Sequence, residues 1–474
     1  MVSFRVTLRV TLMVAASAAV LGGCSLAPVY EKPVVAVPVQ YKEQGPWAQA
    51  APSDRLPRGA WWDGAHDVEL TRLEGQVDAA NPDLADALAR ENEASAYLEQ
   101  TRSHLYPSIG VDASVTNNRQ SNNRPLRGSG QPDEYRADTI GLELDYDLDL
   151  WGKVRNEVAA SKDLALAASD DMESVRLSLH AKLADAYFAL RGDDAQLRLL
   201  HDSEHAYSHA LAIATNRYKG GIAPAEDMTR ASTSLYTVRA QISDVEGQRA
   251  LSEHAIASLV GVPASNFSIA ADAAPLNFDA VPVGVPSTLL ERRPDVAAAE
   301  RRVAAANASI GIARAAFFPD LTLSPIIGFQ STQTANWLSA PNVFWAIGPE
   351  LTATLFDAGR HEAELSAARA RLDESAAQYR STVLHAFQQV EDNLALLGKL
   401  RDEARSQDLA VRNASLTLQF ALDQYQAGAV SYLDVFDAQT AALDTARAAI
   451  DLRTRYLHAS VGLVRALGGG WRQG

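Results

Sequence analysis

Cysteine is almost absent from this 474-residue sequence, which has only Cys24. One cysteine excludes an intrachain disulfide framework and any cysteine-rich zinc or iron–sulfur site within one chain. Positive charge is also scarce: 43 Lys and Arg stand against 58 Asp and Glu, and the net charge of -15 argues against nucleic acid as the main partner. After the first thirty residues, no apolar run reaches the roughly 18 residues that a membrane-spanning helix needs.

The N-terminus, in contrast, has the pattern of a signal peptide over residues 1–23. Two arginines precede an apolar run that ends in Leu-Gly-Gly directly before Cys24. This ending resembles the bacterial lipobox, so Cys24 is the expected lipid attachment site; the alternative is a secretory signal that happens to end beside a cysteine. By the same resemblance, Ser25 favours the outer membrane. Residues 24–65 are rich in proline and predict an extended tether.

The rest of the chain is a duplication. Short motifs of the first half return in the second half at one spacing, which shortens once from 212 to 207 residues. The echoes are Asn81–Leu84 with Arg293–Val296, Leu105–Ser108 with Phe317–Asp320, Gly152 with Gly359, Tyr218–Gly221 with Tyr425–Gly428, Asp227 with Asp434, and Gly261 with Gly468. We therefore predict a first repeat at 66–261, a proline-marked linker at 262–288, a second repeat at 289–468 and a tail at 469–474.

Long helices are predicted inside each repeat. Between residues 153 and 217 there is no proline and apolar residues recur at spacings of three and four, and no proline follows residue 349. A helix of about 60 residues is roughly 90 Å long, so it cannot fold around a compact core. Its apolar stripes must instead be buried against neighbouring helices in a coiled-coil-like wall.

Four other segments alternate with a period of two and predict strands at about 108–117, 139–151, 321–331 and 347–357. In the clearest segment, every even position is apolar and every odd one is Gly, Glu or Asp; its acids are Glu143, Asp145, Asp147 and Asp149. Such segments are typical of a membrane β-barrel, with the apolar face toward lipid and these acids facing the lumen. The alternative is a half-buried soluble sheet.

Four strands cannot close a barrel by themselves, because the unpaired edges would leave backbone groups without hydrogen bonds in hydrocarbon. Chains must therefore share one barrel. Two, three or four copies would supply about 8, 12 or 16 strands, all of which are allowed. An oligomer is predicted, and its size stays open on this arithmetic.

Together these features resemble the TolC/OprM-type outer-membrane efflux family, in its lipoprotein branch. The resemblance covers nearly the whole mature chain. It rests on the lipobox, the duplicated halves, the segment Leu290–Asp295 and the segment Tyr425–Asp437 with its echo Tyr218–Asp227. It implies a mainly α fold with membrane β, in which a homotrimer forms a twelve-stranded outer-membrane β-barrel, four strands per chain, continued by a long periplasmic α-helical barrel.

The resemblance also implies a function and partners. The protein would be the exit duct of a tripartite efflux system, conducting drugs or other small toxic compounds from an adaptor (membrane fusion) protein and a proton-driven inner-membrane transporter across the bacterial outer membrane. It would be no enzyme and need no cofactor besides the lipid on Cys24. Alternatives are a duct for secreted proteins or for metal ions, although four methionines are few for copper or silver. A non-conducting envelope scaffold is a further alternative, against which the acid-lined strands argue.

Within this resemblance, the segment Gly428–Asp437 matches the periplasmic tip, where the tunnel narrows to a closed aperture. Asp434 and Asp437, three residues apart, share one helix face, and in a trimer they become two carboxylate rings that attract cations. Leu433 is the expected apolar constriction beside them. Alternatively, both acids are helix N-terminal residues favoured by the helix dipole, and both interpretations can hold together.

The resemblance further makes Tyr425 and Asp227 partners in a hydrogen bond that holds the aperture shut. Gly428 and its echo Gly221 suit turns between helices that need a positive φ. The sequence departs from the TolC pattern at Val430, where those members carry an arginine, so a charged latch is in question at that position.

One metal-like motif is assigned no role. His201, Glu204 and His205 spell the pattern H-x-x-E-H, and His209 continues the four-residue spacing. No distal acidic ligand or substrate pocket is indicated, so a solvated helix face is expected here in place of a metal site or a periplasmic hydrolase. The sequence has no P-loop, G-x-G-x-x-G or G-x-S-x-G motif, and a nucleotide-driven role therefore has no support.

Replacing the predicted lipid acceptor gives a direct test of the anchor. Cys24→Ala should leave an unacylated precursor, because the lipobox offers no other thiol. Metabolic labelling with a radioactive fatty acid should mark the wild-type chain and leave the variant unlabelled. Normal labelling of the variant would refute the lipid anchor.

Overall fold

The computed structural model describes residues 25–38, 40–43, 60–123, 130, 132–279, 281 and 292–469. The predicted signal peptide, Cys24, part of the tether, the end of the linker and nearly all of the tail lie outside these described residues. The chain forms two compact units: unit 1 comprises Met1–Pro33, Arg90–Ala168 and Ala298–Tyr379, and unit 2 comprises Val34–Ala89, Ser169–Ala297 and Arg380–Gly474.

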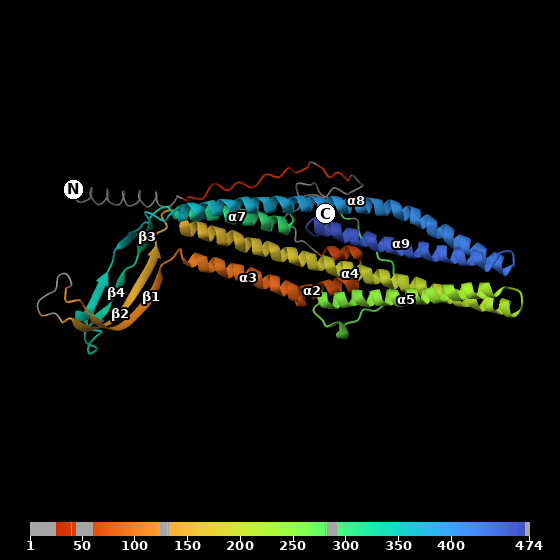
Figure 1. Ribbon diagram of the computed structural model, residues 1–474, viewed down its shortest axis with the longest axis horizontal. Helices are drawn as coiled ribbons and strands as arrows, with labels where there is room; N and C mark the ends of the chain where they lie inside the picture. The colour runs from red at the N-terminus through yellow and green to blue at the C-terminus, as the bar shows by residue number, and fades with distance from the viewer. Residues whose placement is uncertain are drawn as a thin grey trace. The chain divides into compact units, whose positions relative to one another are not determined.

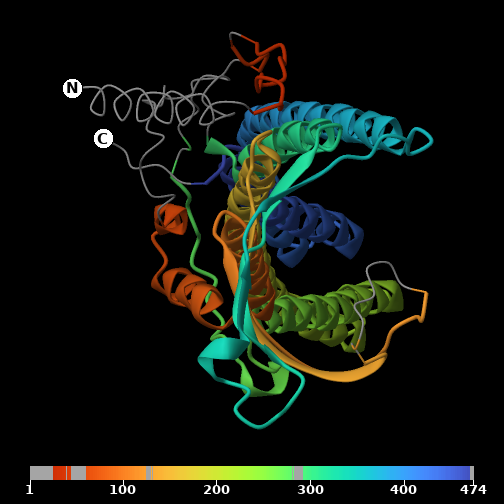
Figure 2. The same cartoon turned by 90° about the vertical axis from the view of Figure 1, so that its left-hand side faces the viewer.

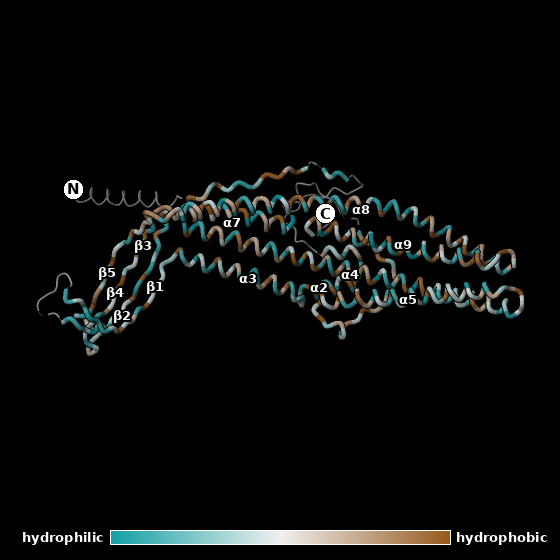
Figure 3. The backbone as a smooth tube through the Cα atoms, in the orientation of Figure 1, coloured by the Kyte–Doolittle hydropathy of each residue, from teal (hydrophilic) through white to brown (hydrophobic). Residues whose placement is uncertain are grey.

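Helices make up most of the described chain (Figure 1). They are η1 (Trp61–Ala65), α2 (Val68–Ala80), α3 (Pro82–Ser103), α4 (Lys153–Lys219), α5 (Ala225–Leu259), η2 (Ala264–Asn266), α7 (Pro294–Ala315), η3 (Ala340–Asn342), α8 (Arg360–Gln426) and α9 (Tyr432–Ala466). In Figure 3, hydrophilic and hydrophobic residues are interspersed along α4 and α8, as expected for helices with one buried face. Among the described residues, no helix has both the length and the apolar character of a membrane span.

The duplication is visible in the helix lengths. α3 and α7 both have 22 residues and begin 212 residues apart, at Pro82 and Pro294. α4 and α8 both have 67 residues, α5 and α9 both have 35, and the members of each pair are 207 residues apart. The predicted internal duplication is therefore confirmed, together with both of its spacings.

Unit 1 contains the sheet, whose strands are β1 (Ser108–Arg119), β2 (Glu134–Asp147), β3 (Asp320–Leu323), β4 (Ile326–Ser331), β5 (Val343–Ala346) and β6 (Pro349–Thr352). The strand order is β5-β4-β2-β3-β6, with β1 also paired to β2, and all pairs are antiparallel. β1 pairs with β2 along its whole length, and Figure 2 shows the two as a long curved ribbon.

The two strands predicted in the second repeat are wrong as continuous strands. The segment 321–331 is divided into β3 and β4 at Pro325, which has no N–H to donate and only accepts a hydrogen bond from the Leu144 N–H at 3.0 Å. Within the segment 347–357 only Pro349–Thr352 is a strand, β6, while β5 (Val343–Ala346) ends before the segment begins. Pro349 begins β6, a position in which a proline is tolerated because no preceding ladder bond is lost.

In unit 2, a side chain from the start of each repeat donates a hydrogen bond to a carbonyl at the end of the last helix of that repeat. In the first repeat, Asn81 Nδ2 donates a hydrogen bond to the Leu259 carbonyl at the end of α5, at 2.7 Å. In the second repeat, Arg293 Nη1 donates to the Ala466 carbonyl at the end of α9, at 2.9 Å. Because the last four carbonyls of a helix lack partners inside it, these two side chains satisfy acceptors that would otherwise be buried alone.

The glycines that follow these helices allow a close approach of the backbone. Gly261 and Gly468 have φ angles of 73° and 86°, in the left-handed region. A Cβ atom at either position would overlap the carbonyl oxygen of Ala80 or of Arg292, respectively. The start and the end of each repeat are therefore held together at a glycine that no larger residue can replace without strain.

Truncating the buried Arg293 tests its hydrogen bonds at the end of α9. Arg293 is 7% exposed and also donates to Gln389 Oε1 at 2.9 Å and to Asp295 at 2.6 and 2.9 Å. Arg293→Ala leaves these acceptors unpaired and should destabilise the fold by about 2–3 kcal/mol, seen as a lower midpoint of thermal unfolding. The exposed residue change Arg369→Ala, on α8, is the control and should change stability by less than about 0.5 kcal/mol. Equal midpoints of thermal unfolding for both variants would contradict a stabilising role of the Arg293 hydrogen bonds.

Candidate functional site

Two turns between antiparallel helices form the candidate site in unit 2. α4 ends at Lys219 and α5 begins at Ala225, while α8 ends at Gln426 and α9 begins at Tyr432. Each turn contains a glycine in the left-handed region: Gly221 with φ of 72° and Gly428 with φ of 77°. This is the conformation that the sequence predicts for both glycines.

The hydrogen bonds of the two turns match. The Gly428 N–H donates to the Tyr425 carbonyl at 3.0 Å and the Ala429 N–H donates to the Gln424 carbonyl at 2.9 Å. The first repeat has the same pair of bonds, from Gly221 to Tyr218 and from Ile222 to Arg217, both at 2.9 Å. Both turns are thus Schellman motifs, which end a helix sharply and return the chain in the opposite direction.

The start of α9 has the exposed acids. The Asp434 carboxylate accepts hydrogen bonds from the Ser431 N–H at 3.2 Å and from the Ser431 hydroxyl at 2.9 Å, and the two residues form a capping box. The helix-terminal interpretation of Asp434 therefore describes its contacts within the chain. Leu433, Asp434 and Asp437 are all exposed on α9, whereas Tyr432 beside them is buried.

The structure brings Tyr425 and Asp227 together. The Tyr425 hydroxyl donates a hydrogen bond to Asp227 Oδ2 at 3.2 Å. Tyr425 and Asp227 are only 4% and 8% exposed, respectively. Burial and the negative charge of Asp227 raise the pKa of Tyr425, so its hydroxyl stays protonated and keeps its role as donor. The edge of Tyr432 contacts the same ring in a T-shaped pair with a centroid distance of 5.3 Å.

Arg217 of α4 also binds Tyr425, a contact that sequence reasoning missed. Its guanidinium carbon lies 4.7 Å from the centre of the Tyr425 ring, and its Nη1 donates to the Tyr425 carbonyl at 2.9 Å. The available signal was a basic residue in the last turn of a predicted helix, which often binds helix carbonyls. Nothing in the sequence indicated that Arg217 would bind a carbonyl of the other repeat.

Small residues surround this cluster and let the helices approach closely. The buried set comprises Ala210, Ala214, Ala231, Ala421, Tyr425, Tyr432, Val435 and Ala438, from α4, α5, α8 and α9. Alanine is the commonest residue of the buried set and the two tyrosines are the largest side chains in it. Larger apolar residues that are only partly buried pack against the set: Leu211, Ile213, Leu418, Leu422, Val430 and Phe436. A displacement of Tyr425 would therefore open the packing of all four helices.

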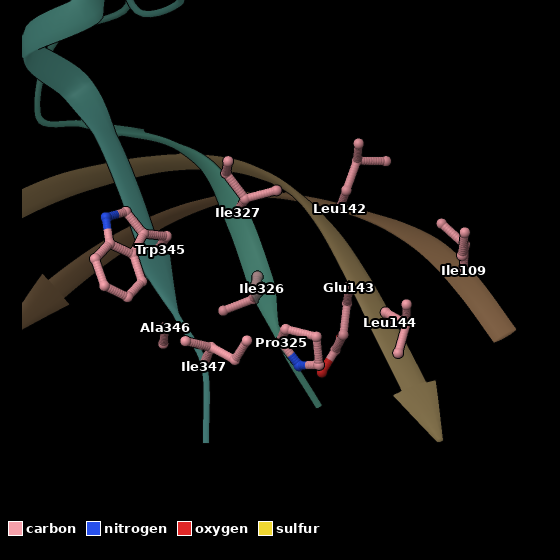
Figure 4. Close-up of a pocket in the computed structure, with 10 residues that line it drawn as sticks. All are labelled: Ile109, Leu142, Glu143, Leu144, Pro325, Ile326, Ile327, Trp345, Ala346 and Ile347. Atoms are coloured by element: carbon pink, nitrogen blue, oxygen red, sulfur yellow. The ribbon is translucent and has the colours of Figure 1, made fainter. Parts of the chain in front are cut away.

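The sheet of unit 1 exposes a row of apolar side chains. Val111, Leu142, Ile327 and Trp345 are successive cross-strand neighbours on β1, β2, β4 and β5. They are between 51% and 69% exposed, and Figure 4 shows Leu142, Ile327 and Trp345 on adjacent strands around a pocket. A soluble half-buried sheet would cover such a row with its own core, whereas a membrane strand turns it toward lipid.

Three of the four acids predicted on the polar face of this strand lie in β2. Glu143, Asp145 and Asp147 alternate with the apolar residues of β2, and Asp145 Oδ1 accepts a hydrogen bond from the Ser324 hydroxyl at 2.9 Å. The alternation places these acids on the face opposite to the apolar row.

The assignment of Asp149 to the strand is wrong, and the strand predicted to reach residue 151 ends at Asp147. The Asp149 carboxylate instead accepts hydrogen bonds from the Val154 N–H at 3.2 Å and the Arg155 N–H at 3.0 Å, in the first turn of α4. It also pairs with the Arg155 side chain at 3.0 Å. A helix start competes for a carboxylate near its free N–H groups, and here it ends the strand two residues before Asp149.

The N-terminal segment of unit 1 lies against α4 and α7. The Ser25 hydroxyl donates to Asn156 at 2.9 Å, Arg314 donates to the Leu26 carbonyl at 3.0 Å, and Asn307 donates to the Pro28 carbonyl at 2.9 Å. These bonds begin at the first residue after Cys24. Residues 25–38 of the predicted tether contain neither helix nor strand, and Ser25, Leu26 and Pro28 are hydrogen-bonded to α4 and α7.

The histidine motif lies on an exposed part of α4. His201, His205 and His209 are all exposed, and Glu204 pairs with Arg239 at 2.8 Å. Within the described ranges, no group of three or more His, Cys, Asp or Glu side chains is arranged to hold a metal ion.

Comparisons with known proteins cover nearly the whole chain. The family model described as outer membrane efflux protein matches twice, over residues 73–262 and 285–469. The cation efflux system protein CusC of Escherichia coli O6:H1 is 31% identical over 459 residues, which are 96% of this chain and 97% of CusC. The antibiotic efflux pump outer membrane protein ArpC of Pseudomonas putida is 31% identical over 468 residues, or 97% and 95% of the two chains. A solved membrane protein of Pseudomonas aeruginosa has a TM-score of 0.86 at 31% identity and covers 94% of this chain and 98% of its own.

Proposed function

Because the chain belongs to the outer membrane efflux protein family, it is an outer-membrane channel of a tripartite efflux system and not an enzyme, and we propose that the two helix turns of unit 2 are its gate. The predicted family, function and outer-membrane location are confirmed. The predicted fold class is confirmed too: the solved neighbours are trimeric channels, and the described chain is mostly helical with a β-sheet.

The hydrogen bond from Tyr425 to Asp227 is the observation that carries the gate. It joins α8 to α5, and hence the second repeat to the first, at the turns where both helix pairs end. Its two partners are buried, and the buried residues around them include five alanines. A bond of this kind is easily broken by a modest displacement of α8, which is the property that a gate requires.

The acids of α9 supply the selectivity of this gate. In a trimer, Asp434 and Asp437 form two rings of three carboxylates on the exposed side of α9. Like charges held close together attract counter-cations and repel one another, so they favour cation passage and resist further narrowing. Leu433, exposed beside them, forms an apolar constriction.

Cys24 is the lipid attachment site in this proposal, and the tether secures it to the fold. Ser25, the next residue, is hydrogen-bonded to Asn156 of α4. An acylated Cys24 is thereby held close to unit 1, whose exposed apolar row faces lipid. Several acyl chains give a stable anchor, whereas one chain gives only marginal binding.

The cargo is a small organic compound, such as a drug, in this proposal. Relatives at 31% identity include both a cation efflux protein and an antibiotic efflux protein, so the two cargo classes need a separate criterion. Soft metal ions prefer thiolate, thioether and imidazole ligands, and the chain has only 4 Met, 10 His and one Cys. The partners are a periplasmic adaptor and a proton-driven inner-membrane transporter. Comparing the drug and copper susceptibility of a strain that lacks the gene with that of the same strain carrying the gene separates organic from metal cargo. A secretion defect in the strain that lacks the gene would point to protein cargo.

Removing the acid rings tests the selectivity. Asp434→Ala combined with Asp437→Ala should raise single-channel conductance severalfold in a planar bilayer and shift the cation-to-anion permeability ratio toward one, because the attraction for cations is lost. Asp451→Ala, on an exposed part of α9 farther from the turn, is the matched control and should leave both values unchanged. Unchanged conductance and selectivity in the double variant would remove these residues from the gate.

Removing one hydroxyl tests the closure. Tyr425→Phe deletes the hydrogen bond to Asp227 but keeps the ring, so the closed state should lose about 1 kcal/mol per protomer, which is about fivefold in the opening equilibrium of each protomer, and the open fraction should rise. The equivalent tyrosine of the first repeat, exposed Tyr218, supplies the control variant Tyr218→Phe. If both variants open equally often, the hydrogen bond does not close the channel.

A further inference from the structure

Tyr425, in the last turn of α8, contacts three other helices, and only one of these contacts reaches its backbone. Asp227 of α5 binds its hydroxyl and Tyr432 of α9 packs on its ring. Arg217 of α4 contacts both the ring face and the carbonyl oxygen. Substitutions of the tyrosine side chain leave this backbone contact in place, so it is independent of the bond to Asp227.

The geometry of Arg217 uses the two properties that distinguish arginine from lysine. The guanidinium plane covers the Tyr425 ring, with 4.7 Å between the guanidinium carbon and the ring centre, while Nη1 still reaches the carbonyl at 2.9 Å. A planar cation with several N–H donors can stack and donate at the same time. An ammonium group can be attracted to the ring but cannot reproduce both contacts from one position.

The carbonyl that Arg217 binds is the acceptor that closes the second turn. Tyr425 lies in the last turn of α8, and its carbonyl also accepts the Gly428 N–H at 3.0 Å. The end of a helix has a partial negative charge, which a cation stabilises. The guanidinium also lies next to Gly428 itself, since a Cβ there would be 4.0 Å from Arg217 Nη2.

The backbone of Arg217 closes the first turn. Its carbonyl accepts hydrogen bonds from the Ile222 N–H at 2.9 Å and the Ala223 N–H at 3.3 Å, which end α4. Arg217 therefore takes part in both turns: its main chain belongs to the turn of the first repeat, and its side chain holds the turn of the second. A movement of one helix pair away from the other must break the side-chain contacts.

The contact is also poised to release. Arg217 Nε is buried and has no hydrogen-bond partner in the described structure, so the closed arrangement carries the desolvation cost of one N–H group. Separation of the helix pairs would admit water to this group. The closed state gains the stack and the Nη1 bond and loses the hydration of Nε, and this balance makes the contact reversible.

We propose that Arg217 is a positioning residue of the gate, which holds Tyr425 and the Gly428 turn in the closed position and supplies from the first repeat the cationic latch that Val430 cannot provide. This inference rests on the proposed gate and adds to it a second, charged connection between the repeats. It predicts that closure depends on the shape of the guanidinium group as well as on its charge.

The test is single-channel recording of purified trimers that carry variants of this residue. Arg217→Ala should raise the open fraction roughly tenfold, because both the stack and a hydrogen bond of a charged group are lost. Arg217→Lys should restore less than half of the closure, since the charge returns without the planar fork. Lys219→Ala removes the same charge from the exposed last turn of the same helix and is the matched control, with no change expected.

A double-mutant cycle separates positioning from general stability. Combining Arg217→Ala with Tyr425→Leu should raise the open fraction by less than the product of the two single effects, because both changes remove the same stack and only the Nη1 bond to the Tyr425 carbonyl is lost with Arg217 alone. Additive effects, or full closure by Arg217→Lys, or equal opening by Lys219→Ala, would each overturn the proposal. If Arg217→Ala does not assemble as a trimer, Arg217→Gln takes its place in the cycle.

The same recordings distinguish this inference from the proposed gate. If Tyr425→Phe and the Asp434 and Asp437 variants change conductance while Arg217→Ala does not, the gate stands and Arg217 has no part in it. If none of these variants changes conductance, the gate itself is wrong.

Discussion

The burial of Tyr425 is the constraint on which the helical end of unit 2 depends. Four helices from two repeats meet around its ring, and Tyr425 and Tyr432 are the largest buried side chains of this cluster. Its hydroxyl, its ring and its carbonyl are each held by a different helix. The closed arrangement therefore has a single centre, and a small change at that centre alters the packing of every helix around it.

The duplication makes this convergence possible. Helices of 67 and 35 residues occur in both repeats with the same Schellman turn between them, so the two turns carry equivalent groups. The equivalence ends at the contacts between the repeats. Arg217 and Tyr425 do not occupy equivalent positions in the two halves, and the asymmetry lets one repeat hold the other.

Much of this architecture could be predicted from the sequence, and what could not has physical reasons. Helix periodicity and the spacing of 207 residues depend on local order, so the long helices and their turns were predicted correctly. The strand predicted to include Asp149 was too long because a carboxylate suits both a polar strand face and a helix start, and the helix start prevailed. The second-repeat strands were predicted as continuous because the alternation was given more weight than the prolines, but Pro325 lies between β3 and β4 and Pro349 begins β6. Arg217 was missed because its partner is a backbone carbonyl 208 residues away, and backbone acceptors leave no pattern in a sequence.

The most direct test of this account measures the distance between the two turns. Spin labels at Ile222→Cys and Ala429→Cys, both exposed turn positions, report this distance in trimers that contain one labelled protomer. The account predicts one short distance in the wild-type channel and a second, longer distance in the Tyr425→Phe channel, in proportion to its open fraction. A rise in conductance with an unchanged distance distribution would contradict it, because the passage would then open without separation of the helix pairs.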